Sequence, residues 1–346
     1  MKFSIITPIY NTSIEKLGKC IDSVRKQKFE IYEHILVNDG SVNTKNIEKY
    51  IKKLQKKDKN LIYIYQLNLG SAVARNTGLN NVTGDYIMFV DADDELVDGF
   101  YNNFKMHLNK DLADVIFFDY TKCNNINKEY FNISSNSNDI ISLKDDILSN
   151  ILYYPNKMND YLCGSIWGKC FSKKFIKNNK IMFIDKLRKA QDRRFMLEVL
   201  INAKKMYYYP IHSYIYFSND DSICHKINFK MVDYYYYLYM EITSFILKNK
   251  INKSVSKFFV YSIFNELLLL TVFHSKYKDN YFKKKKKYKE IYKKFSIDLY
   301  ITDLNISDFP SFNSKLRFFL IKYNCFFLLI IVSLLKQRKD NKNNFK

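Results

Sequence analysis

The chain of 346 residues is long enough for one large domain or two modest ones with their own hydrophobic cores. Its 56 basic against 35 acidic residues give a net charge of +21, which favours anionic partners such as nucleotides, nucleic acids or phospholipid surfaces. The six cysteines form no CxxC pair, so neither a zinc site nor a disulfide framework is predicted, and we expect a reducing, cytosolic setting. No signal-peptide pattern opens the chain, so we expect a protein that is not secreted.

Residues 1–120 alternate between short apolar runs and amphipathic stretches. Strands are expected at residues 3–9, 34–40, 60–66, 85–90 and 113–120. Helices are expected between them, at residues 14–24, 47–54, 71–79 and 96–108. Thr12 and Glu15 form a capping-box pattern before the first helix. This alternation predicts an α/β fold with a mostly parallel central sheet flanked by helices.

Polar residues follow these strands at their carboxyl ends, outside which ligands bind in such sheets. Three loops are therefore expected to converge on one crevice. The polar residues concerned are Thr7, Pro8, Tyr10 and Asn11 after the first strand, Asn38 and Asp39 after the second, and Asp91 to Asp94 after the fourth.

The acidic cluster follows a buried strand directly, and carboxylates this close disfavour one another's ionisation. Asp91 and Asp93, separated by the small Ala92, could hold Mg²⁺ or Mn²⁺ and leave positions for a substrate diphosphate. The alternative is an acidic N-terminus for the helix expected after Glu95, which the helix dipole favours.

The second half of the chain changes character. Strand patterning ends near Asp221, and the residues beyond are aromatic, basic and helical in pattern, so a boundary is expected near residue 225. The run YFKKKKKYKEIYKK at residues 281–294 is either a solvated helix face or a membrane-facing patch.

The segment 316–338 is apolar in its middle, and basic residues flank the apolar stretch on both sides, namely Lys315, Arg317, Lys336, Arg338 and Lys339. Its longest apolar stretch is the eleven residues 325–335, whereas a spanning helix needs about 20. We expect one interfacial helix lying on an anionic membrane surface. A buried packing helix and a true span are the alternatives.

Four motifs then occur in a fixed order: SIITPIYN, VNDGS, NLGSAVARNTGL and DYIMFVDADD. In order and spacing they resemble the family 2 glycosyltransferases with a GT-A fold, closely over residues 1–120 and loosely to about 225. The resemblance implies a GT-A domain at 1–225, with a nucleotide-sugar half at 1–120 and an acceptor half at 121–225. A mainly helical, basic region would follow at 226–346.

The resemblance also implies the donor contacts. Asp39 would hydrogen-bond the base, for which uridine is expected, Asp91 would contact the ribose or sugar, and Asp93 would bind Mn²⁺ or Mg²⁺. The nucleotide-sugar residues implied are Thr7, Pro8, Tyr10, Asn11, Asp39, Asn68, Gly70, Arg75, Asp91 and Ala92.

Four of these residues have a simpler alternative role. Asp39 fits an Asx-type turn, and Arg75 fits a surface salt bridge. Asn68 and Gly70 could simply shape their loop.

The family supplies its general base as the Asp of a Glu-Asp pair that opens a helix with a following Phe. Asp192 and Phe195 match that pattern, but Gln191 replaces the Glu and keeps its size without its charge. Asp192 is therefore expected to deprotonate the acceptor hydroxyl in an inverting displacement, and Gln191 to hydrogen-bond the acceptor or its neighbours. Helix capping is the alternative for Asp192.

Two further residues are candidates. Trp167 matches a recurrent aromatic position and is expected either to stack on the acceptor sugar or to be a core residue. His225 could reach the diphosphate or metal, or be an ordinary surface histidine.

The leading prediction is an enzyme that moves a sugar from a nucleotide-sugar donor to a glycan or lipid-linked acceptor of capsule, lipopolysaccharide or exopolysaccharide synthesis. It would be cytoplasmic and docked peripherally on the inner face of the cell membrane. One alternative is a non-catalytic sugar-nucleotide binder, made thinkable by Gln191. The other is a nucleic-acid binder, but the acidic crevice and the missing RNP-type or OB-type strand argue against a nucleic-acid partner.

Overall fold

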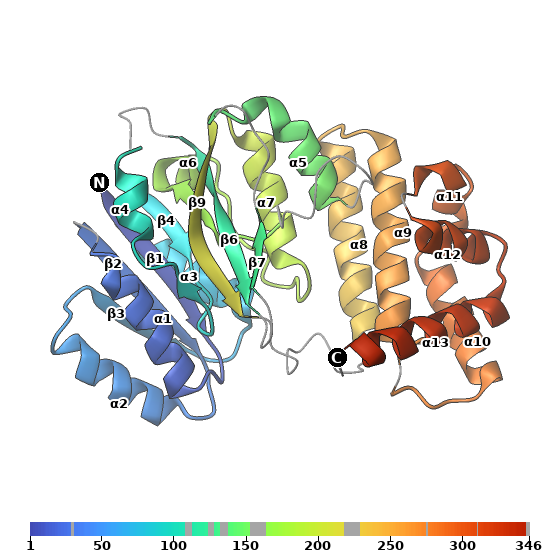
Figure 1. Ribbon diagram of the computed structural model, residues 1–346, viewed down its shortest axis with the longest axis horizontal. Coiled ribbons are helices and arrows are strands. Elements are labelled where there is room, and N and C mark those ends of the chain that lie inside the picture. Colours follow the sequence, from blue (N-terminus) through green and yellow to red (C-terminus); the bar gives the residue numbers. More distant parts are fainter. Residues whose placement is uncertain are drawn as a thin grey trace. The chain divides into compact units, whose positions relative to one another are not determined.

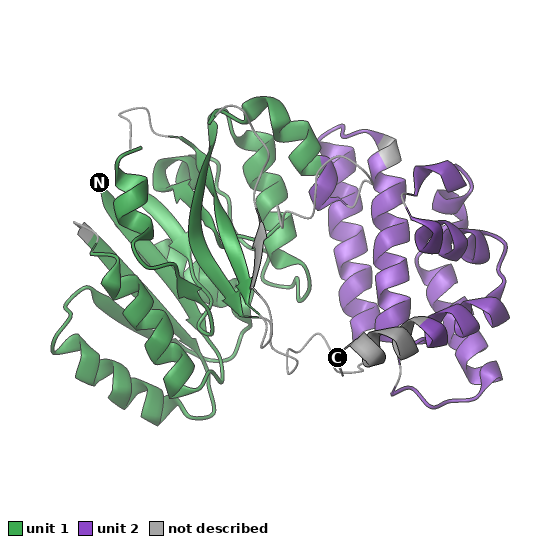
Figure 2. Ribbon diagram, viewed as in Figure 1, with its two compact units in different colours: residues 1–148, 159–219 green, residues 149–158, 220–346 purple. Residues whose placement is uncertain are grey.

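The structure is a computed structural model that describes residues 1–28, 31–107, 113–123, 128–131, 138–152, 164–217, 229–274, 276–309 and 311–343. The chain divides into two compact units (Figure 2). Unit 1 comprises residues 1–148 and 159–219, and unit 2 comprises residues 149–158 and 220–346. The boundary predicted near residue 225 falls within 218–228, outside the described residues.

Unit 1 is built on one mixed β-sheet (Figure 1). Its described strands are β1 Lys2–Ile9, β2 Ile31–Asp39, β3 Leu61–Gln66, β4 Tyr86–Phe89, β5 Glu95–Leu96, β6 Val115–Cys123, β7 Lys128–Phe131, β8 Lys169–Ser172 and β9 Met206–Phe217. Their order is β3-β2-β1-β4-β8-β6-β9-β5, with β7 paired to β6. The first four strands in this order are parallel, and β8 is antiparallel to both of its neighbours. The predicted α/β class is confirmed, and the carboxyl ends of β1, β2 and β4 share one edge.

The described helices up to residue 202 are α1 Ile14–Lys26, α2 Thr44–Gln55, α3 Ser71–Asn81, α4 Phe100–Lys105, α5 Lys144–Ile151, α6 Lys173–Asn178 and α7 Gln191–Asn202, with a 3-10 turn at Ile141–Leu143. The predicted capping box at Thr12 is wrong: Ser13 is the N-cap of α1 and accepts a hydrogen bond from the Lys16 N–H. The helix predicted from residue 96 begins only at Phe100, because Glu95–Leu96 pairs with β9 as a strand. The acidic cluster therefore does not open that helix.

Helices cover both faces of the parallel strands. Leu17 and Ile21 of α1 and Ile47 of α2 pack with Leu36 of β2 in one buried cluster. On the other face α3 approaches β1 closely, because a Cβ on its Gly78 would lie 2.4 Å from a side-chain carbon of Ile6. This close approach holds the N-terminal end of α3 at the edge where the loops meet.

Glu33 joins β2 to the turn before β4 at the opposite edge. Its carboxylate accepts hydrogen bonds from the Ser4 hydroxyl (2.5 Å) and from the N–H and hydroxyl of Thr83 (2.5 and 2.6 Å), and lies 3.1 Å from Lys2 Nζ. Burial by itself raises the pKa of Glu33, but these bonds outweigh it and hold the pKa at about 2.

We expect Glu33→Gln to lower the free energy of unfolding by about 2 kcal/mol at neutral pH. A depressed pKa stabilises the fold fully above the unfolded value of 4.5, and the benefit disappears as the pH falls toward about 2. Urea unfolding of both proteins between pH 7 and pH 2 measures the effect, and the difference between the two stabilities should shrink below pH 4.5 and disappear only as the pH approaches about 2. Glu15→Gln on the exposed side of α1 is the control. Parallel stability curves for Glu33→Gln and the native chain would contradict this account.

Unit 2 is helical. Its described helices are α8 Met231–Lys248, α9 Lys253–Leu270, α10 Tyr281–Lys294, α11 Ile297–Ile301, α12 Phe312–Lys322 and α13 Phe326–Asn343, with a 3-10 turn at Ile306–Asp308. The lysine-rich run 281–294 forms α10.

The segment 316–338, predicted as one helix, is instead parts of α12 and α13. They are separated by a turn in which Asn324 takes a left-handed conformation (φ 53°). Arg317, expected to flank a membrane helix, is buried over the ring of Phe273. Among the described residues no helix has the length and apolar character needed to cross a bilayer.

Candidate active site

The first two loops at the carboxyl edge are tied together by Asn11. Its N–H donates to the Ser41 hydroxyl (3.0 Å), and its side-chain oxygen accepts from the Val42 N–H (2.9 Å). Asn11 adopts a left-handed conformation (φ 53°), which asparagine tolerates better than most residues. Tyr10 beside it is 46% exposed, so a large aromatic side chain is presented at this edge.

Asp39 ties the second loop to the third. Its carboxylate accepts hydrogen bonds from the N–H groups of Leu69 and Gly70 (both 2.9 Å) and from the side-chain amide of Gln66 (2.8 Å). Asp39 is buried, so these bonds fix the loop 67–70 in place. The base of a bound nucleotide could donate a hydrogen bond only to a lone pair of this carboxylate that these three bonds leave open.

Gly40→Ala is expected to destabilise the protein by about 1–2 kcal/mol more than Gly99→Ala. Both glycines have positive φ, +66° and +72°, so the backbone strain of an alanine is similar at the two positions. Only at Gly40 would the new Cβ meet backbone, 2.6 Å from the N of Asn68, whereas nothing lies within 4 Å at Gly99. Urea unfolding of the two variants measures the difference. If both variants lost the same free energy of unfolding, the close contact between Gly40 and the backbone of Asn68 would not affect stability.

The third loop leads into α3 and meets the segment before α7. Gly70 has φ +98°, and a Cβ there would lie 1.9 Å from Nη1 of Arg188, which donates to the Leu69 carbonyl at 3.0 Å. The Ser71 hydroxyl donates to the side-chain oxygen of Gln191 at 3.1 Å. Gln191 therefore contacts the loop of the predicted nucleotide-sugar half directly.

An aromatic cluster holds the start of α7 against the end of β4. The ring of Phe89 in β4 lies 5.9 Å from that of Phe195 in α7, and both pack against Phe183 at 5.6 and 4.3 Å between ring centroids. Because Asp192 lies one helical turn before Phe195, this packing places its carboxyl group beside the residues that follow β4.

Arg75 joins the two carboxylates. Its Nη2 lies 2.9 Å from Oδ1 of Asp91 and its Nη1 lies 3.2 Å from Oδ1 of Asp192. The guanidinium is buried, with 7% of the residue exposed, so the surface salt bridge considered for Arg75 is instead a buried one. Burial raises the pKa of the Asp192 carboxyl above its usual value, while the positive Arg75 opposes that rise and Asp91 adds to it.

The acidic cluster divides into separate roles. Asp94 is buried and accepts hydrogen bonds from the Tyr214 hydroxyl (2.7 Å) and the Phe217 N–H (2.8 Å). The same hydroxyl accepts from the Asp91 N–H at 3.1 Å. Burial and then repulsion from Asp91 raise the pKa of Asp94 well above its usual value. Asp94 thus anchors β9, while Asp93 next to it is exposed.

The oxygen ligands that a cation could use here are few. Asp91 shares its carboxylate with Arg75, Asp93 is exposed, and no group of three metal-ligating side chains occurs within the described residues. The two carboxylates on either side of Ala92 fit a hard cation such as Mg²⁺ or Mn²⁺ only if ligand or water oxygens complete its shell.

The other predicted site residues are placed as follows. Thr7 is buried with its hydroxyl 2.9 Å from Nε2 of His34, and Ala92 belongs to the buried cluster under α1. Trp167 is buried and stacks on Tyr214, with ring centroids 4.8 Å apart. Its predicted contact with an acceptor stays a prediction. Pro8 is half-buried and Asn68 exposed at the carboxyl edge. His225 lies outside the described residues.

Sequence reasoning missed Tyr214 and Arg188. Tyr214 lies 120 residues from Asp94 along the chain and Arg188 lies 119 residues from Leu69. Neither belongs to a motif, so nothing in the sequence signals these contacts.

A sequence profile described as "Glycosyl transferase family 2" matches residues 4–181. The chain belongs to this family.

Curated relatives of this family 2 glycosyltransferase include Glycosyltransferase GlyA of Streptococcus pneumoniae serotype 4, which is 32% identical over 49% of this chain and 24% of the relative. The chain thus spans about a quarter of the length of GlyA. Poly(ribitol-phosphate) beta-N-acetylglucosaminyltransferase TarP of Staphylococcus aureus (strain N315) is 30% identical over 74% of this chain and 75% of TarP.

Solved structures of S. aureus TarS 1-349 share the fold. The TM-score is 0.62 at 18% identity, over 98% of this chain and 92% of the other. The same protein solved with UDP-GlcNAc gives a TM-score of 0.62 at 17% identity, over the same shares of the two chains. The GT-A class implied by the resemblance is therefore confirmed.

Proposed function

We propose that this glycosyltransferase moves a sugar from a nucleotide-diphospho-sugar, with uridine as its base, to a glycan or lipid-linked acceptor, inverting the anomeric carbon. The observation that carries the proposal is the single guanidinium of Arg75 bonded to both Asp91 and Asp192. It joins the carboxylate implied to contact the donor sugar to the carboxylate implied as general base. The TarS structures with UDP and UDP-GlcNAc, which share the fold, support the choice of donor.

In the proposed reaction the acceptor hydroxyl attacks the anomeric carbon from the side opposite the diphosphate. Asp192 takes the hydroxyl proton, a new carbon–oxygen bond forms, and the bond to the diphosphate breaks, releasing the nucleoside diphosphate. A general base works best with a pKa closer to the working pH, and burial of Asp192 moves its pKa in that direction. Arg75 keeps the carboxyl oriented by its hydrogen bond.

Gln191 does not disturb this arrangement. Its side-chain oxygen accepts from Ser71, as a glutamate oxygen would, so the hydrogen bond to the donor-side loop needs no charge. The contact favours the enzyme over the non-catalytic binder.

We further propose that Asp93, with Asp91, holds Mn²⁺ or Mg²⁺ when the donor binds. The ion would neutralise charge on the diphosphate. We also propose that the lysine-rich helix α10 of unit 2 attaches the enzyme peripherally to the inner face of a cell membrane, where it would act on intermediates of capsule, lipopolysaccharide or exopolysaccharide synthesis.

A thermal-shift screen of nucleotide-sugars with Mn²⁺ or with EDTA tests the donor and the metal together. A ligand at 100 times its Kd stabilises the native state by about 2.7 kcal/mol, which raises the melting temperature by several degrees. We expect a UDP-sugar to give this shift with Mn²⁺ and a smaller one with EDTA.

Asp93→Asn should lose the manganese-dependent part of the shift. Asp98→Asn, at an exposed carboxylate on the same stretch of chain, is the matched control and should behave as the native protein. If no nucleotide-sugar raises the melting temperature, the proposed function is wrong. An equal shift with EDTA refutes only the metal.

A further inference from the structure

Two surface features of unit 2 have no part in the proposed reaction. One is a row of lysines along α10, and the other is an uncovered apolar side of α13. Both helices belong to the same unit and are in contact through the rings of Tyr288 and Phe326, whose centroids lie 5.1 Å apart.

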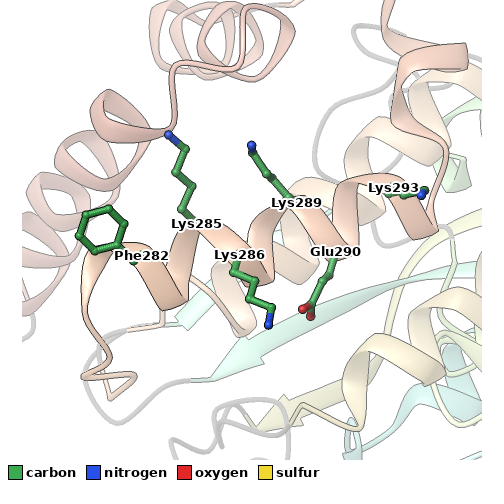
Figure 3. A pocket seen from close by; sticks show the side chains of 6 residues that line it. All are labelled: Phe282, Lys285, Lys286, Lys289, Glu290 and Lys293. Carbon is green, nitrogen blue, oxygen red and sulfur yellow. The ribbon is translucent and has the colours of Figure 1, made fainter.

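The lysine face of α10 is one side of that helix. Figure 3 shows its side chains extending away from the helix around an open groove lined by Phe282, Lys285, Lys286, Lys289, Glu290 and Lys293. These positions follow the spacing i, i+3, i+4, i+7, i+8 and i+11, so they share one side. The opposite side is buried through Tyr288 and Ile291.

Ion pairs with the described residues leave most of the positive charge of the lysine face unneutralised. Lys286, Lys289 and Lys293 form no ion pair with any described residue, and Glu290 is already paired with Lys287 at 3.1 Å. Phe282, at the end of the same face, is 79% exposed. The face thus presents four ammonium groups together with one aromatic ring.

The apolar face of α13 lies on the outside of that helix. Its inner side is buried through Phe326, Leu329 and Ser333. Its outer side carries apolar side chains that are 38–60% exposed, namely Phe327, Leu328, Ile331, Leu334 and Leu335. A helix that is apolar on all sides is normally buried or in contact with lipid. Nothing described in unit 2 covers this outer side.

The two faces meet at one aromatic group. The Lys285 ammonium lies 5.5 Å from the centre of the Tyr281 ring, and that ring lies 5.5 Å from Phe282 and 6.4 Å from Phe327. The basic and apolar surfaces are therefore continuous, with aromatic rings at the boundary between them.

We propose that the lysine face of α10 and the apolar face of α13 together dock unit 2 onto an anionic phospholipid bilayer. The lysines match the lipid phosphates, and the apolar side chains enter the boundary between headgroups and acyl chains. A soluble phosphate polymer would match the lysines alone and leave the apolar face in water. Because the inner side of α13 is buried and only its outer side is exposed, the proposed contact lies in the plane of the membrane.

Sedimentation of the full chain with vesicles tests this docking without donor or acceptor. We expect binding to vesicles of phosphatidylcholine with 30% phosphatidylglycerol and little binding to phosphatidylcholine alone. Changing Lys285, Lys286, Lys289 and Lys293 to Gln should weaken the binding at least about tenfold. The matched control changes four exposed lysines of and beside α2 to Gln, namely Lys45, Lys49, Lys53 and Lys56, and should bind as the native chain does.

The apolar part is tested separately. Phe327→Ser with Leu334→Ser should remove the binding that survives high salt, whereas Leu247→Ser with Leu299→Ser, at exposed sites on α8 and α11, should not. The proposal is wrong if the native chain does not bind anionic vesicles. It is also wrong if the variant with four lysines changed in and beside α2 loses as much binding as the variant with four lysines changed in α10. It is also wrong if soluble polyphosphate is bound and vesicles are not. The donor-induced thermal shift of each variant should stay native, so a failure of docking and a failure of the donor proposal are distinguishable.

Discussion

Asp192→Asn is expected to lower the rate of sugar transfer by about 10³-fold while leaving donor binding close to the native value. Asparagine keeps the size of the side chain and can turn its oxygen toward Arg75, so it can still accept the hydrogen bond that Arg75 donates to Asp192 at 3.2 Å. It cannot accept the proton of the acceptor hydroxyl. The loss therefore belongs to turnover and not to the donor complex.

The measurement is released nucleoside diphosphate, followed with and without acceptor, together with the donor-induced thermal shift. Glu198→Gln is the matched control: it removes a carboxylate six residues further along α7, where the side chain is paired with Arg194 at 2.6 Å, and should retain activity. Full transfer by Asp192→Asn would refute the assignment of the base. A parallel loss of donor binding would point to a structural role for the carboxyl group.

Arg75→Met is expected to cost about 3 kcal/mol in the free energy of unfolding and at least about 10²-fold in transfer rate. The substitution leaves Asp91 and Asp192 facing each other in a largely buried site without their shared cation. Both the carboxylate implied for the donor and the one implied as base then lose their orientation. Stability and transfer should therefore fall together.

Two further variants separate charge from shape. Arg75→Lys keeps the charge but lacks the fork that reaches both carboxylates, so an intermediate result is expected. Adding Asp91→Asn to Arg75→Met removes one of the two repelling charges and should restore part of the stability, but not the activity. Urea midpoints and transfer rates give both quantities. If the urea midpoint of Arg75→Met equals that of the native protein, the double ion pair does not stabilise the fold.

Much of the carboxyl edge follows from local pattern. Apolar runs of strand length end just before Asn11, Asp39 and Asp91, and parallel strands put those ends on one edge. The helix carrying Asp192 was likewise predictable, because its motif and the following Phe195 are contiguous in the chain. The hydrogen-bond partners of these residues could not be predicted from the sequence. The Asx-type turn considered for Asp39 is wrong: its carboxylate oxygens accept from residues 27 to 31 positions away, and the neighbouring Asn38 accepts from the Ser41 N–H instead.

In the C-terminal region, too, the sequence pattern did not predict the tertiary contacts. Apolar spacing indicated a helix over 316–338, but a left-handed Asn324 divides it, and nothing in the periodicity marks that turn. Arg317 counts as a surface charge in any composition argument, whereas the structure buries it over Phe273. Which side of α13 stays uncovered depends on the packing of α10, and packing is not a property of the segment itself.

The sequence by itself determined the class of fold, the edge at which the loops gather and the carboxylates delivered there, because each depends on the residue types of one short segment. Only the tertiary structure decided that Arg75 joins Asp91 to Asp192, that Asp94 anchors Tyr214, and that basic and apolar surfaces meet at Tyr281. These contacts link side chains from separate segments. Their energies depend on distance and burial, which a linear order of residues does not fix.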